Sequence, residues 1–144
     1  MKIDHIGVAV ALIEPALKLY VDALGGKVAS RESVDHMKLS VCKVELGGVV
    51  IELLQPQAGE KTISKFLSTR GEGIHHICYA VPDIAAAQAR LTAQGYRAVW
   101  ANPMSGSEGK LVTFLHPKDT NCVLIERNSS RRSGSTCSGA VTRK

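Results

Sequence analysis

The sequence predicts an α+β fold, in which two tandem βαβββ modules form one cupped, eight-stranded mixed sheet around a metal site. Three observations lead to this prediction. A histidine-bearing octapeptide occurs twice within 144 residues, a glutamate-bearing segment follows each copy, and nearly the same distance separates the two motifs in both halves. Repetition of this kind is typical of a duplicated supersecondary unit.

The two copies align without ambiguity. Residues 3–10 read Ile-Asp-His-Ile-Gly-Val-Ala-Val and residues 74–81 read Ile-His-His-Ile-Cys-Tyr-Ala-Val, so five of eight positions are identical and His5 aligns with His76. Residues 49–53 read Val-Val-Ile-Glu-Leu and residues 123–127 read Val-Leu-Ile-Glu-Arg, which aligns Glu52 with Glu126. The histidine precedes the glutamate by 47 residues in the first half and by 50 in the second.

The first half is expected to contain one helix after its first strand. Apolar residues recur there at helical spacing, Pro15 suits a first helical turn, and Gly25-Gly26 ends the helix. Strand-like runs follow at 27–31, 38–46 and 49–54. The apolar positions expected to face inward are Ile13, Ala16, Leu17, Tyr20 and Leu24.

The second half repeats this pattern. Asp83 is expected to cap a helix that buries Ile84, Ala87 and Leu91 and ends at Gly95. Strands are expected at 97–101, 111–115 and 122–126. A short helix over 62–68, capped by Thr62, is expected to link modules 2–58 and 73–127.

Composition sets the remaining limits. Apolar residues make up 44% and charged residues 22% of the chain, as in an ordinary globular domain. The net charge of +5 is concentrated after residue 127, in a stretch rich in Ser, Gly and Thr. We therefore expect one domain over 1–127, a basic polar tail over 128–144, and no nucleic-acid partner. Without a membrane-length apolar run or a signal peptide, a cytoplasmic location is expected. None of the four cysteines has CxxC spacing, so reduced thiols are expected.

The duplicated residues have the chemistry of metal ligands. Strand side chains alternate between faces, and both ligand-bearing strands are apolar on both faces. A buried imidazole and a buried carboxylate each require a partner. If the modules close around one cavity, His5, Glu52, His76 and Glu126 provide two nitrogen and two carboxylate ligands, which are neutral overall with a divalent cation. This set favours cobalt, zinc, nickel, manganese or iron over calcium or magnesium.

These motifs resemble the vicinal oxygen chelate superfamily and, within it, the methylmalonyl-CoA epimerases. The resemblance covers residues 2–127 and is carried by residues 3–10, the Gly73-Ile74-His75-His76-Ile77 stretch, the segments 52–56 and 123–126, and His116-Pro117-Lys118-Asp119. It implies that an acyl-CoA substrate places two neighbouring oxygens on the metal, which stabilises an enolate when the α-proton leaves. Glu126 is then the first candidate for the acid/base group. The resemblance also implies a homodimer, in which exposed strand edges would be covered.

Other functions remain open at this point. Glyoxalase I enzymes have a very similar His/Glu/His/Glu set, so lactoylglutathione lyase activity is the main alternative. An extradiol dioxygenase would use two histidines and one glutamate, and the non-enzymatic small-molecule-binding proteins of this fold do not use these ligands. The chain departs from the epimerase pattern in one respect. Some members carry a second acid/base glutamate near the position of Ser40, but residues 37–43 contain no carboxylate.

Overall fold

The computed structural model describes residues 2–121 and 123–132. The first half contains β1, a short helix α1 continued by a π-helical segment, and a three-stranded meander. Residues 35–37 form a single 3₁₀ turn within that meander. The bounds are β1 Lys2–Ala9, α1 Ile13–Leu17, π-helix Lys18–Ala23, β2 Lys27–Val34, β3 Leu39–Leu46 and β4 Val49–Pro56.

The second half repeats the order after a linking helix. A 3₁₀ turn at residues 107–109 precedes β7, and another at residues 117–119 follows it. The bounds are α2 Thr62–Arg70, β5 Gly73–Val81, α3 Ile84–Ala93, β6 Met104–Ser105, β7 Lys110–Leu115 and β8 Ile125–Arg132. Among the described residues, no helix is long and apolar enough to cross a membrane.

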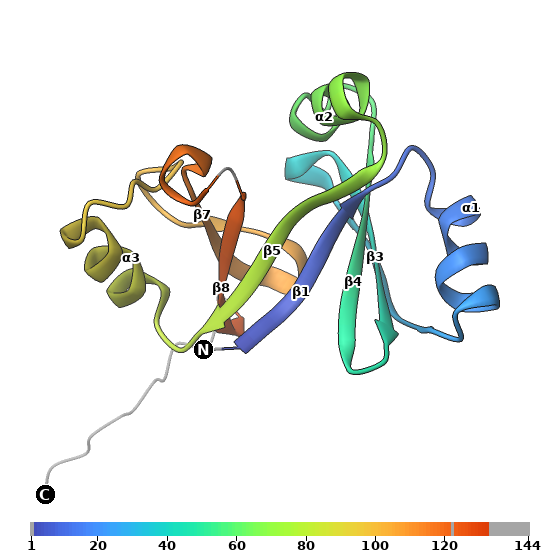
Figure 1. Cartoon of the computed structure of the whole chain (residues 1–144), viewed down its shortest axis with the longest axis horizontal. Coiled ribbons are helices and arrows are strands. Elements are labelled where there is room, and N and C mark those ends of the chain that lie inside the picture. Colours follow the sequence, from blue (N-terminus) through green and yellow to red (C-terminus); the bar gives the residue numbers. More distant parts are fainter. Residues whose placement is uncertain (1, 122, 133–144) are drawn as a thin grey trace, which may run out of the picture.

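All eight strands belong to one mixed sheet in the order β2-β3-β4-β1-β5-β8-β7-β6. β1 is parallel to β4, β5 is parallel to β8, and β1 and β5 meet antiparallel at the centre. Each strand of one half thus has its counterpart at the matching position of the other. Figure 1 shows the two half-sheets curling away from this central pair, with α1 and α3 on opposite flanks. The predicted fold class is confirmed.

Two apolar clusters explain why the central strands are apolar on both faces. On the α1 side, Val8, Val10 and Leu53 pack with Ile13 and Leu17 of the helix. On the other face, Ala9 of β1, Leu39 and Val41 of β3 and Leu54 of β4 pack against Ile63 of α2. Leu24, expected to face inward, is instead 52% exposed. The hydrogen bonds of a π-helix join residues five apart instead of four. The end of this segment is therefore rotated away from the face that a continuous α-helix would turn toward the core.

Helix capping agrees with the prediction at one helix and differs at another. The Asp83 carboxylate accepts the Ala86 amide at 2.9 Å, as expected for the cap of α3. At α2 the predicted cap, Thr62, is wrong. Glu60 caps this helix instead, because its two carboxylate oxygens accept the amides of Thr62, Ile63 and Ser64 at 2.7–3.0 Å.

The strand expected at 97–101 is also wrong. This segment has only an isolated bridge between Ala98 and Leu115, and the strand at the sheet edge is β6. The Arg97 amide donates to the Asp119 carboxylate at 2.9 Å, and the Arg97 guanidinium donates to both oxygens of that carboxylate. Two backbone hydrogen bonds, from the Val99 amide to the Phe114 carbonyl and from the His116 amide to the Arg97 carbonyl, pair the segment with residues 114–116 without forming a full strand.

The last strand extends beyond the expected domain boundary at residue 127. β8 runs to Arg132, so residues 128–132, expected in the polar tail, belong to the sheet; the rest of the predicted tail lies outside the described residues. Arg127 is 2% exposed, and its three guanidinium nitrogens make no hydrogen bond with any described residue. Burial lowers the pKa of this guanidinium, and Arg90 lowers it further. β8 therefore buries a charged side chain at a position where an apolar side chain would avoid the cost of losing contact with water.

Candidate metal centre

The two repeated histidines lie side by side on the central strands. Gly7 of β1 is directly opposite His76 of β5, and His5 is opposite Cys78. Both imidazoles are almost fully buried, at 2% and 3% exposed. Their Nε2 atoms are 3.1 Å apart, so the two rings point toward the same position in space.

The repeated glutamates approach from the two flanking strands. β4 places Glu52 beside Gly7, and β8 places Glu126 beside Cys78. Glu52 Oε2 is 3.1 Å from His5 Nε2 and 3.8 Å from His76 Nε2. Glu126 Oε2 is 2.9 Å from His76 Nε2, and its Oε1 is 4.0 Å from His5 Nε2. The fold thus brings together all four residues that the repeat singled out.

Neighbouring side chains orient these groups. His5 Nδ1 is 2.8 Å from Asp4 Oδ2, an arrangement that turns Nε2 toward the other three side chains. Ser107 Oγ donates to Glu52 Oε1 at 3.0 Å, and Cys78 Sγ donates to Glu126 Oε1 at 3.4 Å. Cys78 and Cys42 are both free and buried, as expected, whereas Cys122 and Cys137 lie outside the described residues.

Charge pairing dominates the electrostatics of the cluster. Burial lowers the pKa of His5, but hydrogen bonds to Asp4, Cys78 and Glu52 outweigh it and raise this pKa to about 12. Burial raises the pKa of Glu52, but His5, His76 and Lys43 together lower it to about 2. Burial raises the pKa of the Cys78 thiol to about 12, so this sulfur is a neutral donor at physiological pH.

The donor set fits a divalent transition metal. Single donor atoms of His5, Glu52 and His76 all lie within 4.8 Å of one another, and Glu126 adjoins both histidines. Two imidazoles and two carboxylates are the mixed nitrogen and oxygen set that such ions prefer. An ion bound by the four would replace the mutual hydrogen bonds of these buried groups with coordinate bonds.

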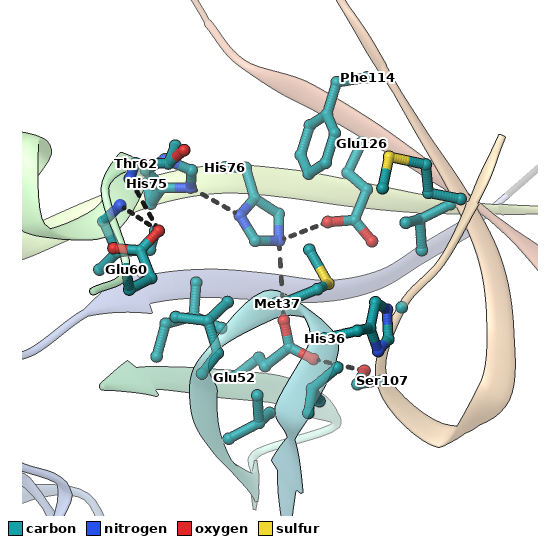
Figure 2. Close-up of a pocket in the computed structure, with 18 of the residues that line it drawn as sticks. His36, Met37, Glu52, Glu60, Thr62, His75, His76, Ser107, Phe114 and Glu126 are labelled. Atoms are coloured by element: carbon teal, nitrogen blue, oxygen red, sulfur yellow. Dashed lines mark hydrogen bonds and ion pairs between the residues drawn. The ribbon is translucent and has the colours of Figure 1, made fainter. Parts of the chain in front are cut away.

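Three residues of the cluster form part of the wall of a cavity of about 260 Å³. Figure 2 shows Glu52, His76 and Glu126 converging in this cavity, with Phe114 above them and Met37 opposite. The remaining lining is largely apolar, and His36 and Ser107 lie at its edge. One charged cluster in an otherwise apolar chamber is typical of a small-molecule site.

His75 is a cavity residue that the alternation of strand faces did not predict. Regular alternation along a strand would place it on the face opposite to His76, yet its Nδ1 is 3.0 Å from His76 Nδ1 and its ring lines the cavity (Figure 2). The β1–β5 pairing passes from Gly7–His76 to Val8–Ile74, which leaves His75 as an extra residue. Such a bulge redirects a side chain, and nothing in the local sequence announces it. Burial lowers the pKa of His75 to about 4.

The residues of β3 that line the cavity carry no acid/base group. Its cavity-lining residues are Leu39 and Val41, and both are apolar. Glu60 also lines the cavity, but its carboxylate is engaged by the amides of α2. β3 therefore provides no cavity-lining carboxylate in place of the second acid/base glutamate that some epimerases carry near the position of Ser40.

Comparisons with known proteins agree with the predicted fold class. The model of the glyoxalase/bleomycin resistance protein/dioxygenase superfamily matches residues 4–114. An ethylmalonyl-CoA/methylmalonyl-CoA epimerase of Cereibacter sphaeroides is 39% identical over 127 residues, which cover 87% of this chain and 95% of that protein. The mitochondrial methylmalonyl-CoA epimerase of Homo sapiens is 36% identical over 126 residues, covering 87% and 72%.

Solved structures show the same relationship. A methylmalonyl-CoA epimerase of Streptomyces coelicolor, in complex with 2-nitronate-propionyl-CoA, superposes with a TM-score of 0.84 at 31% identity. The match covers 90% of this chain and 97% of that one.

Proposed function

This chain belongs to the glyoxalase/bleomycin resistance protein/dioxygenase superfamily, and we propose that within it the chain is a divalent-metal-dependent methylmalonyl-CoA epimerase. The proteins that it resembles include epimerases, and the matches with them cover most of this chain. The observation that carries the proposal is the convergence of His5, Glu52, His76 and Glu126, the last three of which line the cavity. We propose these four side chains as the ligands of one cobalt, zinc, nickel or manganese ion per chain.

The proposed reaction inverts the carbon between the two carbonyl groups of the substrate. When bound, the metal supplies Lewis-acid stabilisation of the negative charge that develops as the α-proton leaves. Glu126 is the proposed acid/base group, because its carboxylate lies on the cavity wall within reach of a bound substrate. The apolar lining excludes water and strengthens the electrostatic interactions at the reacting carbon.

Two contacts within the cluster fix the position of the Glu126 carboxylate for this role. His76 Nε2 contacts one oxygen of its carboxylate, and the neutral Cys78 thiol donates to the other. Both contacts come from β5, the strand next to β8, so the position of the carboxylate is set by strand pairing rather than by a loop. Inversion is complete when a donor other than Glu126 returns a proton to the opposite face of the carbon.

We also propose a homodimer. The sheet of this chain ends in β2 on one side and β6 on the other, and edge strands are commonly covered by a partner. Light scattering coupled to size-exclusion chromatography would give twice the chain mass of 15.4 kDa. A monomer at micromolar concentration would contradict this part of the proposal.

The test of the activity compares two substrates with one metal-loaded preparation. We expect epimerisation of methylmalonyl-CoA, with solvent deuterium entering the α position in deuterated water, and no turnover of the methylglyoxal–glutathione hemithioacetal. The opposite pattern would assign lactoylglutathione lyase activity and overturn the proposal. If metal binds but neither substrate reacts, the chain would be a binding module.

A further inference from the structure

Lys43 is a buried lysine next to the candidate metal centre. It lies on β3, directly opposite Glu52 on β4, and only 5% of the residue is exposed. Its Nζ is 3.8 Å from Glu52 Oε1 and 3.0 Å from Glu108 Oε2. Lysine rarely loses its contact with water, because an ammonium group away from solvent requires ionic partners. Here the two carboxylates are those partners.

Glu108 reaches this lysine from the other module, in an unusual backbone conformation. Its φ of 55° lies in the left-handed region, which non-glycine residues seldom adopt. Three contacts with neighbouring elements hold it there. Its amide donates to Glu32 Oε1 at 2.8 Å, and its carboxylate lies between the ammonium groups of Lys43 and Lys110. Backbone strain of this kind is retained where the surrounding contacts require it.

The two carboxylate oxygens of Glu52 have different partners. Oε1 accepts a hydrogen bond from Ser107, the residue before Glu108, and faces Lys43. Oε2 is left to face the Nε2 atoms of His5 and His76. A carboxylate held in this way would offer a metal one oxygen in a fixed direction.

The same lysine–glutamate contacts extend to His5. Lys110 Nζ is 3.3 Å from Glu108 Oε2 and 3.6 Å from Asp4 Oδ1, and Asp4 Oδ2 contacts His5 Nδ1. The result is a closed ring of alternating charges that we call the charge ring, and it consists of His5, Asp4, Lys110, Glu108, Lys43 and Glu52. The ring joins β1, β3 and β4 of the first module to the 107–110 segment of the second.

We propose that Lys43 and Glu108 are positioning residues, which fix Glu52 so that only its Oε2 faces the metal and thereby set the geometry of the centre. The inference rests on the proposed metal site and deepens the proposed function. Neither residue is placed in contact with the substrate; they act through Glu52. Without them, Glu52 is expected to rotate about its side-chain bonds and to offer both oxygens.

The test uses Lys43→Met, Glu108→Gln and the double variant in the cobalt-loaded protein. Methionine keeps the unbranched shape of lysine without its charge. For each variant we would record the visible absorption spectrum of bound Co²⁺, the Co²⁺ affinity by competition with a chelator, and kcat and KM separately. We expect an altered cobalt spectrum, an affinity 10–100-fold lower, and a fall in kcat with little change in KM. The double variant is expected to lose no more than Lys43→Met alone, because both changes release the same carboxylate.

Two controls separate positioning from stability. Lys18→Met removes an exposed lysine on the far side of the sheet and should leave every readout unchanged. Lys43→Arg retains the charge and is expected to restore the spectrum at least in part. If Lys43→Met does not fold, Glu108→Gln, which alters a carboxylate side chain that is 31% exposed, gives the same measurement.

The outcomes also distinguish this inference from the proposed function. A wild-type cobalt spectrum, affinity and kcat in folded Lys43→Met or Glu108→Gln would overturn the positioning role, even if the melting temperature fell. An altered spectrum in a protein that never epimerises methylmalonyl-CoA would support the positioning role while refuting the proposed reaction.

Discussion

The imidazole of His76 packs against the backbone of Gly7, on the neighbouring strand. A Cβ added to Gly7 would lie 2.2 Å from His76 Cε1, far inside van der Waals contact. The two residues are direct partners in the β1–β5 pairing, so neither backbone can move aside without disturbing the central seam of the sheet. The absent side chain of Gly7 is therefore what allows His76 to face His5.

Gly7→Ala tests this relationship. The added methyl group is expected to push the His76 ring away from its position, because the clash involves three ring atoms at 2.2–2.6 Å. We expect at least a roughly tenfold loss of metal affinity, the lower end of what altered ligand orientation causes, and a similar loss of kcat. Metal titration and steady-state kinetics would measure both.

Gly73→Ala is the matched control. Gly73 lies in β5, where a new Cβ would meet no atom within 4 Å. It should retain metal and activity. Full metal binding by Gly7→Ala, with kinetics like those of the control, would show that His76 is not constrained by this contact.

The two histidines themselves give the second prediction. His5→Ala and His76→Ala should each reduce the metal content and abolish activity, since each removes one of four donors and one partner of the buried carboxylates. Elemental analysis after dialysis against a chelator would give the metal bound per chain. His116→Ala, which changes a histidine outside the cavity lining, is the control. Full occupancy in the double His5→Ala/His76→Ala variant would rule out this site.

The third prediction separates the two roles of Glu126. Glu126→Gln keeps an oxygen donor of similar size but removes the base. Metal affinity should fall modestly, whereas turnover should fall by about 10²–10⁴, the range for loss of a general base. The exchange of the α-proton of methylmalonyl-CoA with deuterated water, followed by mass spectrometry, should slow in proportion. Unchanged exchange in this variant would assign the base to another residue.

The fourth prediction concerns stability alone. Arg127 buries a guanidinium group that has no hydrogen-bond partner among the described residues. Arg127→Leu should therefore raise the free energy of unfolding by about 1–4 kcal/mol, as when buried charges are replaced by apolar side chains. Urea titration of the metal-free protein would measure it. Lys18→Leu, at an exposed position of the π-helical segment, should change stability by less than about 0.5 kcal/mol. A loss of stability in Arg127→Leu would indicate a partner for this charge beyond the described part of the chain.

The sequence alone predicted the modules and the four clustered residues because a duplication repeats both in register. Two His-to-Glu intervals of nearly equal length can only come from equivalent strands, and equivalent strands of paired modules meet at one centre. The cap at Asp83 was predictable for a similar reason, since a side chain that accepts an amide three residues ahead is a local interaction.

Tertiary structure decided the features that depend on contacts distant in sequence. The bulge that turns His75 into the cavity arises from the pairing of β5 with β1, and the acceptor of the Arg97 amide is Asp119, more than 20 residues away. The charge ring joins six residues from both halves of the chain, and no periodicity relates Lys43 to Glu108. Local spacing specifies which face of a strand a residue occupies, whereas the folded chain alone determines which charges meet across it.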